Sequence, residues 1–472
     1  VTNYSKQIYG GGLQNWKIRQ DKNSIIYIAN NEGLLTYNGK FWNLYPLPNK
    51  SILHSIEISE NGRIYVGGQD EVGYFSPAVN GKLTYHSLLD LFPEGKKSFG
   101  DMWEIISFGE DVFFRTNKAI FNLNKNKITV YNPQAEWVLL AQCQNKLYAQ
   151  DISLGLLVWE NGYWRPVQNQ KALNKSDPIT GLIGLEDGSA MVISLRSGIF
   201  YLDSNGLKSI ASVNKDLFTD SRIYAATAVN NTQIALATST SGLIIIDQLG
   251  NIVQKITKEE GLQNNNVLSL LADAQGNIWL GLDNGVDMIA YNSAVKTINP
   301  LQQNGSGYAA IIHQNNLYLG TTNFLYSTAL QNQKDVSFSL GRFTEVEHTE
   351  GQNWGLASIG NKLLLGHHEG AFEIKKNAAF KIVGNIGFWN FNALNNENTI
   401  VAGTYNGLEM LGIDNNNIKA ILNLPDFLES SRYVAIDAEN NIWVSHPYHG
   451  IFKLIAQAGG TYKVEKFTDS SS

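Results

Sequence analysis

Short apolar runs separated by turn residues recur along the whole chain. In one well-defined unit, Val267 to Ala272 is an apolar run, Asp273 to Asn277 is a turn, and Ile278 to Leu282 is a second apolar run. After another turn, residues 286–291 and the more polar residues 295–299 predict a third and a fourth strand. No segment sustains the 3.6-residue periodicity of an amphipathic helix. The pattern therefore predicts an all-β protein built from units of four short strands.

The unit repeats with a period of about 42 residues. The apolar or aromatic second position of the second strand marks eleven copies, at residues 27, 65, 113, 148, 192, 235, 279, 318, 364, 401 and 443. Four-stranded units of this length are typical of β-propeller blades, which pack face to face around a central channel. One ring holds roughly four to eight blades, so eleven copies exceed one ring. We predict a seven-bladed β-propeller over residues 1–300 and a partial, truncated second β-propeller of four blades over residues 301–472.

Composition is consistent with a large folded β protein and argues against several other classes. The 472-residue chain is 43% hydrophobic and 11% aromatic, which supplies a large core and excludes disorder. The formal net charge is −6 and no basic stripe occurs, so we expect no nucleic-acid-binding surface in this region. No apolar run approaches the roughly 18 residues of a membrane helix.

One repeat resembles a known family. The segment GLQNNNV at 261–267, followed by DAQGNIWLG at 273–281, resembles the two-component regulator propeller repeat, and residues 440–445 repeat part of it. The resemblance implies the periplasmic sensor region of a membrane-spanning regulator that attaches to the membrane only through a missing C-terminal segment. It implies ligand sensing, often of saccharides, with no catalysis and no cofactor. The output module, a histidine kinase or a helix-turn-helix domain, and a homodimer are left open.

Two other kinds of propeller remain as alternatives, an enzyme such as a lyase or a glycosidase-like protein and a protein-interaction scaffold. The sialidase Asp box does not match, because Gly276 stands one residue too far from Asp273. No local pattern of a nucleophile with a base, or of paired acids, occurs, so we predict no catalytic residue. Asp21, Asp187, Asp273 and Asp437 follow first strands, where Asx-type turns account for them.

Ligand-binding residues are expected where the first strand of each blade begins and where the second strand turns into the third. Both places should open on the same face of a ring, and loops on such a face commonly carry function. Aromatic rings can stack on a ligand, and Arg432 can donate a forked pair of hydrogen bonds to a carboxylate or to vicinal oxygens. Packing between blades is the alternative role of the tryptophans. The predicted ligand-binding set is Trp354, Trp389, Asn390, Arg432, His367, His368, Tyr405, His446, Trp103 and His54.

Histidines cluster in two of these turns without completing a metal-binding pattern. His367, His368, His446 and His449 make up four of the eight histidines. The two pairs belong to non-adjacent repeats, neighbours such as His367 and His368 tend to diverge on a strand, and no carboxylate or cysteine pattern completes the set, so we predict no metal site. The single cysteine, Cys143, lies in an apolar run and is expected to be buried.

Overall fold

The computed structural model describes residues 1–210, 215–293, 295, 298, 300, 305–330, 343–395, 398–414, 417–424, 426–458 and 461–468. Within these residues it contains eleven four-stranded antiparallel sheets, which confirms the predicted all-β fold of four-stranded blades. The chain forms two compact units, Val1–Ala294 (unit 1) and Val295–Ser472 (unit 2). All eleven marker residues lie in the second strand of a sheet.

The described residues of unit 1 form seven sheets and a few short helices. The helical segments are α1 (Lys6–Tyr9), α2 (Lys215–Ser221) and the 3-10 turns η1 (Leu89–Leu91) and η2 (Lys258–Glu260). The strands, sheet by sheet, are β2 (Asn15–Gln20), β3 (Ile26–Asn30), β4 (Gly33–Tyr37) and β5 (Trp42–Tyr45); β6 (Leu53–Ile58), β7 (Ile64–Gly68), β8 (Val72–Pro77) and β9 (Leu83–Ser87); β10 (Glu104–Phe108), β11 (Asp111–Arg115), β12 (Ile120–Asn124) and β13 (Lys127–Tyr131); β14 (Trp137–Cys143), β15 (Lys146–Asp151), β16 (Gly155–Glu160) and β17 (Tyr163–Pro166); β18 (Ile179–Gly184), β19 (Ala190–Ser194), β20 (Ile199–Asp203) and β21 (Gly206–Ser209); β22 (Ile223–Ala228), β23 (Gln233–Thr238), β24 (Leu243–Asp247) and β25 (Ile252–Ile256); and β26 (Val267–Ala272), β27 (Ile278–Leu282), β28 (Gly285–Ile289) and β1 (Thr2–Tyr4).

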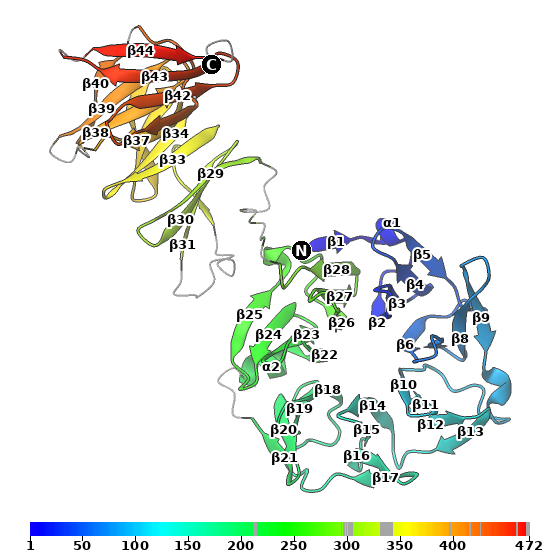
Figure 1. Ribbon diagram of the computed structural model, residues 1–472. Coiled ribbons are helices and arrows are strands. Elements are labelled where there is room, and N and C mark those ends of the chain that lie inside the picture. Colours follow the sequence, from blue (N-terminus) through cyan, green and yellow to red (C-terminus); the bar gives the residue numbers. More distant parts are fainter. Residues whose placement is uncertain are drawn as a thin grey trace. The chain divides into compact units, whose positions relative to one another are not determined.

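The seven sheets of unit 1 are arranged like spokes, with the first strand of each sheet innermost (Figure 1). Apolar side chains of neighbouring sheets pack against each other between the spokes. One such cluster joins Trp279 and Val286 of the last sheet to Ile18 and Ile28 of the first. The ring is therefore closed by the same kind of packing that holds each neighbouring pair of sheets together.

The N-terminal strand completes the last sheet of unit 1. Strand β1 pairs antiparallel with β28, and Asn3 Nδ2 donates to Asp287 Oδ1 at 2.7 Å and to the carbonyl oxygen of Gly261 at 3.0 Å. The ring of Tyr4 stacks on Trp279 with centroids 5.7 Å apart. The prediction that residues 295–299 form this outer strand is therefore wrong, because β1 occupies that place; residues 296, 297 and 299 lie outside the described residues.

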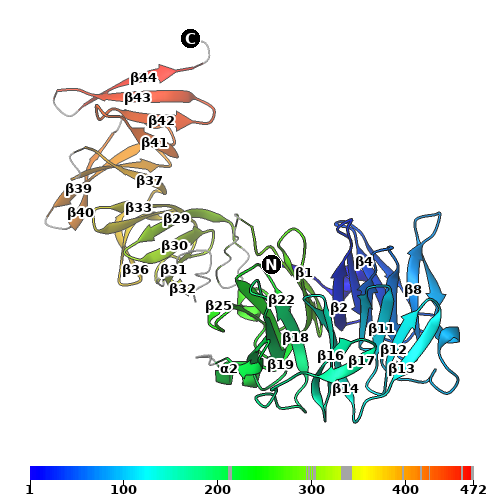
Figure 2. The ribbon, with the colours of Figure 1, turned by 60° about the horizontal axis from the view of Figure 1, so that its bottom comes forward.

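Four sheets are formed by the part of unit 2 that the structure describes, and Figure 2 shows them from a second direction. Apolar clusters lie between successive sheets, as in unit 1. In the part of this unit that the structure describes, every sheet is made of consecutive strands. The strands are β29 (Gly307–His313), β30 (Asn316–Thr321), β31 (Leu325–Ala329) and β32 (Thr344–Glu345); β33 (Asn353–Ile359), β34 (Lys362–His367), β35 (Gly370–Lys375) and β36 (Ala378–Gly384); β37 (Phe388–Ala393), β38 (Thr399–Thr404), β39 (Leu408–Asp414) and β40 (Asn417–Asn423); and β41 (Tyr433–Ile436), β42 (Ile442–His446), β43 (Gly450–Ala456) and β44 (Tyr462–Phe467).

Aspartates at the first turn of several sheets cap that turn. Asp273 Oδ1 accepts hydrogen bonds from the backbone N–H groups of Gln275 and Asn277, and its Oδ2 accepts from Trp279 Nε1 at 2.9 Å. Asp437 repeats the arrangement in unit 2. Backbone capping of this kind, as predicted, occurs at Asp21, Asp187, Asp273 and Asp437.

Two further features follow from the described residues. No helix among them is long and apolar enough to cross a membrane. Cys143 is buried, as predicted, and its burial raises the pKa of the thiol.

Candidate functional site

Most innermost strands carry a β-bulge at the same place, close to where the strand begins. In β33, for example, Asn353 pairs with His367 and Gly355 pairs with Gly366, which leaves Trp354 unpaired. A bulge re-aims the side chain of the extra residue, and bulges are frequent beside functional sites. The unpaired residues of the nine bulged strands are Trp16, His54, Val138, Thr180, Tyr224, Leu268, Tyr308, Trp354 and Trp389.

Two predicted residues occupy the corresponding place in strands without a bulge. Trp103 immediately precedes β10, and Arg432 immediately precedes β41. The eleven sheets thus each present one residue at an equivalent position, and aromatic or cationic residues are concentrated in two groups of neighbouring sheets, one in each unit.

In unit 2, the equivalent residues of four successive sheets form one continuous row. The ring centroids of Tyr308 and Trp354 lie 4.6 Å apart, and those of Trp354 and Trp389 lie 5.0 Å apart. The Arg432 Cζ atom lies 5.1 Å from the centroid of Trp389. We name Tyr308, Trp354, Trp389 and Arg432 the rim row. The structure therefore brings together three of the predicted ligand-binding residues and adds Tyr308.

Tyr405 supports the rim row from the turn between β38 and β39. Its hydroxyl accepts a hydrogen bond from Trp354 Nε1 at 2.7 Å, and its ring centroid lies 4.7 Å from that of Trp389. Gly387 permits this approach, because a Cβ atom at that position would stand 2.3 Å from the Tyr405 ring. Tyr405 is 37% exposed and Tyr308 is 40% exposed, so the site remains open to solvent.

Hydrogen bonds hold the segment that carries Arg432. Asn390 Nδ2 donates to the carbonyl oxygen of Arg432 at 2.7 Å and to that of Ser431 at 3.3 Å. Trp389 Nε1 donates to Ser430 Oγ at 3.3 Å. The predicted residue Asn390 thus positions the backbone beside Arg432. Because both indole N–H groups of the row have partners inside the protein, the row offers ring faces, hydroxyl groups and one guanidinium to a ligand.

The predicted histidines His367 and His368 serve a neighbouring loop. His367 is 2% exposed; its Nε2 lies 3.1 Å from the carbonyl oxygen of Glu350, and its Nδ1 accepts from the backbone N–H of Glu369. His368 Nδ1 accepts from the backbone N–H of Gln352 at 3.2 Å. Burial, and then the neighbouring His368, lower the pKa of His367. We therefore assign both histidines to the support of residues 350–352.

His446 lies in a second polar group, together with His449 and Glu429. The two imidazole rings are stacked with centroids 4.2 Å apart, and His449 Nδ1 lies 2.6 Å from Glu429 Oε2. The side-chain atoms of the three residues lie within 4.8 Å of one another, close enough to share a metal ion. However, His446 Nδ1 accepts backbone N–H groups of Tyr448 and His449, so the proton is on Nε2, which faces Glu429. In this tautomer His446 has no free lone pair for a metal.

The predicted residues Trp103 and His54 meet in unit 1, where Trp16 joins them. His54 contacts Trp16 and Trp103 with ring centroids 5.1 and 4.5 Å apart, and its Nε2 lies 3.3 Å from Asp101 Oδ1. His54 is 6% exposed, and its burial lowers the pKa of the imidazole against the opposing effect of Asp101. This cluster is therefore more closed than the rim row.

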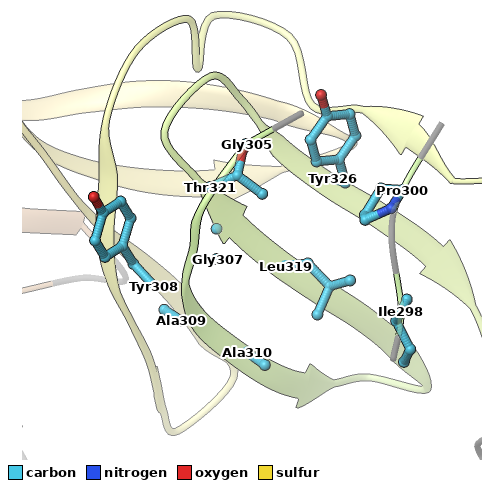
Figure 3. A pocket seen from close by; sticks show the side chains of 11 residues that line it. Ile298, Pro300, Gly305, Gly307, Tyr308, Ala309, Ala310, Leu319, Thr321 and Tyr326 are labelled. Carbon is cyan, nitrogen blue, oxygen red and sulfur yellow. The ribbon is translucent and has the colours of Figure 1, made fainter. Parts of the chain in front are cut away.

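A cavity of about 300 Å³ lies on the first sheet of unit 2, beside the end of the rim row. Tyr308 and Tyr326 flank it, and Leu319 and the small residues Gly307 and Thr321 form much of its wall (Figure 3). Leu319 and Tyr326 belong to the apolar cluster on the side of this sheet that faces away from the next one. Tyr308 is thus shared between the row and the cavity.

Sequence reasoning missed Glu429 as a member of these groups. Alignment of the repeats places Tyr308 where the first strand of the eighth repeat begins, and the structure puts it at the bulge position there, although the predicted ligand-binding set did not include it. Glu429 lies in a loop outside the repeat pattern and reaches His449 only through the fold. No spacing in the sequence connects the two residues.

The fold and these equivalent positions define a β-propeller protein with an open aromatic and cationic rim. The family model of the two component regulator propeller matches residues 261–284. The matched segment contains the repeat on which the sequence resemblance was based.

Known proteins are similar to this chain in sequence or in fold. Histidine kinase P4 of Formosa agariphila is 31% identical over 137 residues, which are 27% of this chain and 10% of that protein. The chain thus spans about a tenth of the length of this curated relative. A structure described as the extracellular domain of a hybrid two component system of B. thetaiotaomicron matches 98% of this chain and 65% of its own, with a TM-score of 0.63 and 16% identity.

A second structure from B. thetaiotaomicron, described as the extracellular domain of a one component system, matches 99% of this chain and 73% of its own. Its TM-score is 0.51 and its identity to this chain is 15%. Both structures share the fold with this chain.

Proposed function

We propose that this chain is the periplasmic, ligand-binding region of a membrane-anchored signalling regulator. In this proposal, unit 2 binds a small polar ligand such as an oligosaccharide at the rim row and passes the signal to an output module outside this chain. The regulator repeat at residues 261–284 and the similarity to a histidine kinase support a role in signalling. The fold shared with extracellular domains of such systems supports the location.

The observation that carries the proposal is the continuity of the rim row. Tyr308, Trp354, Trp389 and Arg432 stand at equivalent positions of four successive sheets, and each side chain contacts the next. The C–H face of a pyranose ring is complementary to the negative face of an aromatic ring. The guanidinium at one end can orient the ligand through its oxygens.

Unit 2 is preferred over unit 1 because its cluster is more open. In unit 1 the central residue, His54, is 6% exposed between two indoles, whereas Tyr308 and Tyr405 are 40% and 37% exposed. Trp103 and His54 are therefore proposed to pack the rim of unit 1.

Binding by the intact chain tests this proposal. A panel of oligosaccharides is screened by thermal shift, and hits are measured by isothermal titration calorimetry. Trp389→Ala should weaken binding at least about tenfold, because it removes the central stacking surface. Phe380→Ala is the matched control, because Phe380 is a 53% exposed aromatic residue on the outer strand β36 of the same unit.

The same experiment distinguishes the alternatives. A sensor returns its ligand chemically unchanged, so mass spectrometry of the recovered oligosaccharide should show no cleavage, whereas products would identify a lyase or glycosidase-like enzyme. Unchanged affinity in both Trp389→Ala and Arg432→Ala would show that the ligand site is elsewhere.

A further inference from the structure

Arg432 is a cation without an acidic partner. Among the described residues, no carboxylate oxygen lies within 4.0 Å of its guanidinium. Its contacts are with two aromatic rings, at 5.1 Å from the centroid of Trp389 and 5.7 Å from that of Tyr433. By contrast, Arg19 pairs with Glu57 and Arg115 pairs with Glu104. The N–H groups of Arg432 are therefore available to a ligand.

The acid nearest to Arg432 along the chain is already engaged. Glu429 Oε2 lies 2.6 Å from His449 Nδ1 and 3.9 Å from His446 Nε2. The carboxylate of Glu429 thus points toward the turn between β42 and β43, whereas the guanidinium of Arg432 lies beside Trp389. This separation keeps the positive charge at the end of the rim row from being neutralised within the protein.

The position of the guanidinium suits a planar anion. Asn390 fixes the backbone at Arg432, and the indole of Trp389 lies beside the guanidinium. A cation over an aromatic face keeps its N–H edge free for hydrogen bonds. A carboxylate accepts two parallel hydrogen bonds from such an edge, which gives both affinity and geometric specificity.

We infer that the ligand of the rim row is an acidic oligosaccharide of the uronic acid class. Its sugar rings stack on Tyr308, Trp354 and Trp389, and its carboxylate binds Arg432. This inference rests on the proposed function, and it adds the charge of the ligand. Because the chain carries a net charge of −6, the attraction is local, and added salt should weaken it.

The test uses uronate-containing trisaccharides, each paired with its carboxyl-reduced product, and isothermal titration with the full chain. The acidic member should bind at least about tenfold more tightly than its reduced partner, as expected for a charge-assisted, forked pair of hydrogen bonds. In R432Q the two members should bind equally. R432K should recover only part of the preference, because an ammonium group lacks the fork.

The matched control is K381Q. It removes one positive charge from the same unit, where Lys381 Nζ lies 5.8 Å from the centroid of the Phe372 ring. This variant should keep the full preference for the acidic sugar. A preference lost equally in K381Q and R432Q would reflect net charge and would overturn the assignment to Arg432.

The remaining outcomes separate this inference from the proposed function. If wild-type protein binds a reduced sugar as well as its acidic partner, and Trp389→Ala abolishes both, the acidic class is wrong while the rim row remains the site. If no member of the panel binds in a Trp389-dependent manner, the proposed function fails, and the inference fails with it. The wild-type comparison does not depend on the folding of any variant.

Discussion

Units 1 and 2 use the same four-stranded sheet but differ in how the last sheet is covered. In unit 1, Trp279 of the last sheet is 5% exposed and packs against the first sheet. In unit 2, the corresponding Trp443 lies beside Phe467 and under Lys453, and Phe467 is 44% exposed. The same local motif thus has two environments. A blade is therefore stabilised largely by its neighbours, as in other repeat proteins.

The inner strands also differ in charge between the units. The residue after the bulge position is Lys17 in the first sheet of unit 1 and Glu104 in the third, whereas in unit 2 it is Ala309, Gly355 or Asn390 in the three bulged strands. Burial, and then the neighbouring Arg19, lower the pKa of Lys17 to about 8. Strand β2 of unit 1 therefore carries an electrostatic cost at Lys17 that these positions of unit 2 avoid.

Deletion of residues 1–5 should have the largest effect, because it opens the ring of unit 1. It removes the pairing of β1 with β28, the hydrogen bonds of Asn3 and the stacking of Tyr4 on Trp279. We expect unit 1 to lose about 5 kcal/mol or more of unfolding free energy. Hydrogen exchange measured by mass spectrometry should show faster exchange in β26–β28 and no change in β33–β39. Unchanged protection of β28 would refute the role of β1 in closure.

The next largest effect is expected when the equivalent tryptophans of the two units, Trp279 and Trp443, are each replaced. Trp279→Ala should cost unit 1 about 3–5 kcal/mol, because it leaves a cavity between two packed sheets. Trp443→Ala should cost unit 2 only about 1–2 kcal/mol, because one face of its sheet is less covered. Urea unfolding followed by peptide-resolved hydrogen exchange separates the two units. Equal costs would mean that coverage by the next sheet does not determine blade stability.

Replacement of Lys17 by Met should stabilise unit 1 at neutral pH. The pKa of Lys17 is about 8 in the folded protein and about 10.4 in an unfolded chain, so the unfolded state binds the proton more tightly. The charge therefore opposes folding below pH 8, and this cost disappears as the pH rises to about 10.4. We expect a gain of about 1–3 kcal/mol at pH 7 and a much smaller one at pH 10. Urea unfolding at pH 7 and at pH 10 measures the gain in unfolding free energy. An equal gain at both pH values would show that the stabilisation comes from packing and not from removal of the charge.

The smallest predicted effect concerns a capped turn in each unit. Hydrogen bonds, first from Trp443, lower the pKa of Asp437 to about 2, and hydrogen bonds from Ser189 and Tyr201 lower that of Asp187 to about 2. Each carboxylate stabilises the fold above its unfolded pKa of about 3.9, and the contribution is lost as the pH falls through 2. In Trp443→Phe, the pKa of Asp437 should rise.

Carbon-13 NMR titration of the carboxyl groups checks this prediction. Asp187 is the internal control, since it lies in unit 1 and should titrate as in the wild-type protein. If the pKa of Asp437 does not change in Trp443→Phe, the indole of Trp443 is not the main hydrogen-bond donor to this carboxylate.

The repeat pattern predicted the blades because each blade depends on short-range alternation and turn residues. The marker residues lie in second strands because an apolar position flanked by turns suits a buried strand. The same alignment predicted that Trp354, Trp389 and Arg432 would share one rim, and their contacts agree with it. Residues at equivalent positions of neighbouring sheets lie side by side, so alignment of the repeats is enough to predict these contacts.

Features that depend on distant segments could not be read from the pattern. Strand β1 spans three residues, Thr2–Tyr4, which is too short to show alternation, and its partner Val286 lies near the other end of the unit. Residues 295–299 come next after the third strand in the sequence, so they were predicted to form the outer strand that β1 forms in the structure. His367 and His368 were expected to diverge as strand neighbours, but β34 ends at His367, and the two rings lie 4.2 Å apart.

The bulge near the start of the innermost strands has a consequence for how such a protein can diversify. A bulged residue makes no paired contact in the sheet, so its identity can change while the hydrogen-bonding pattern of the strand is retained. Nine strands share this freedom. A combinatorial library randomised at these positions would alter specificity on a constant scaffold, which makes the chain a starting point for engineered receptors.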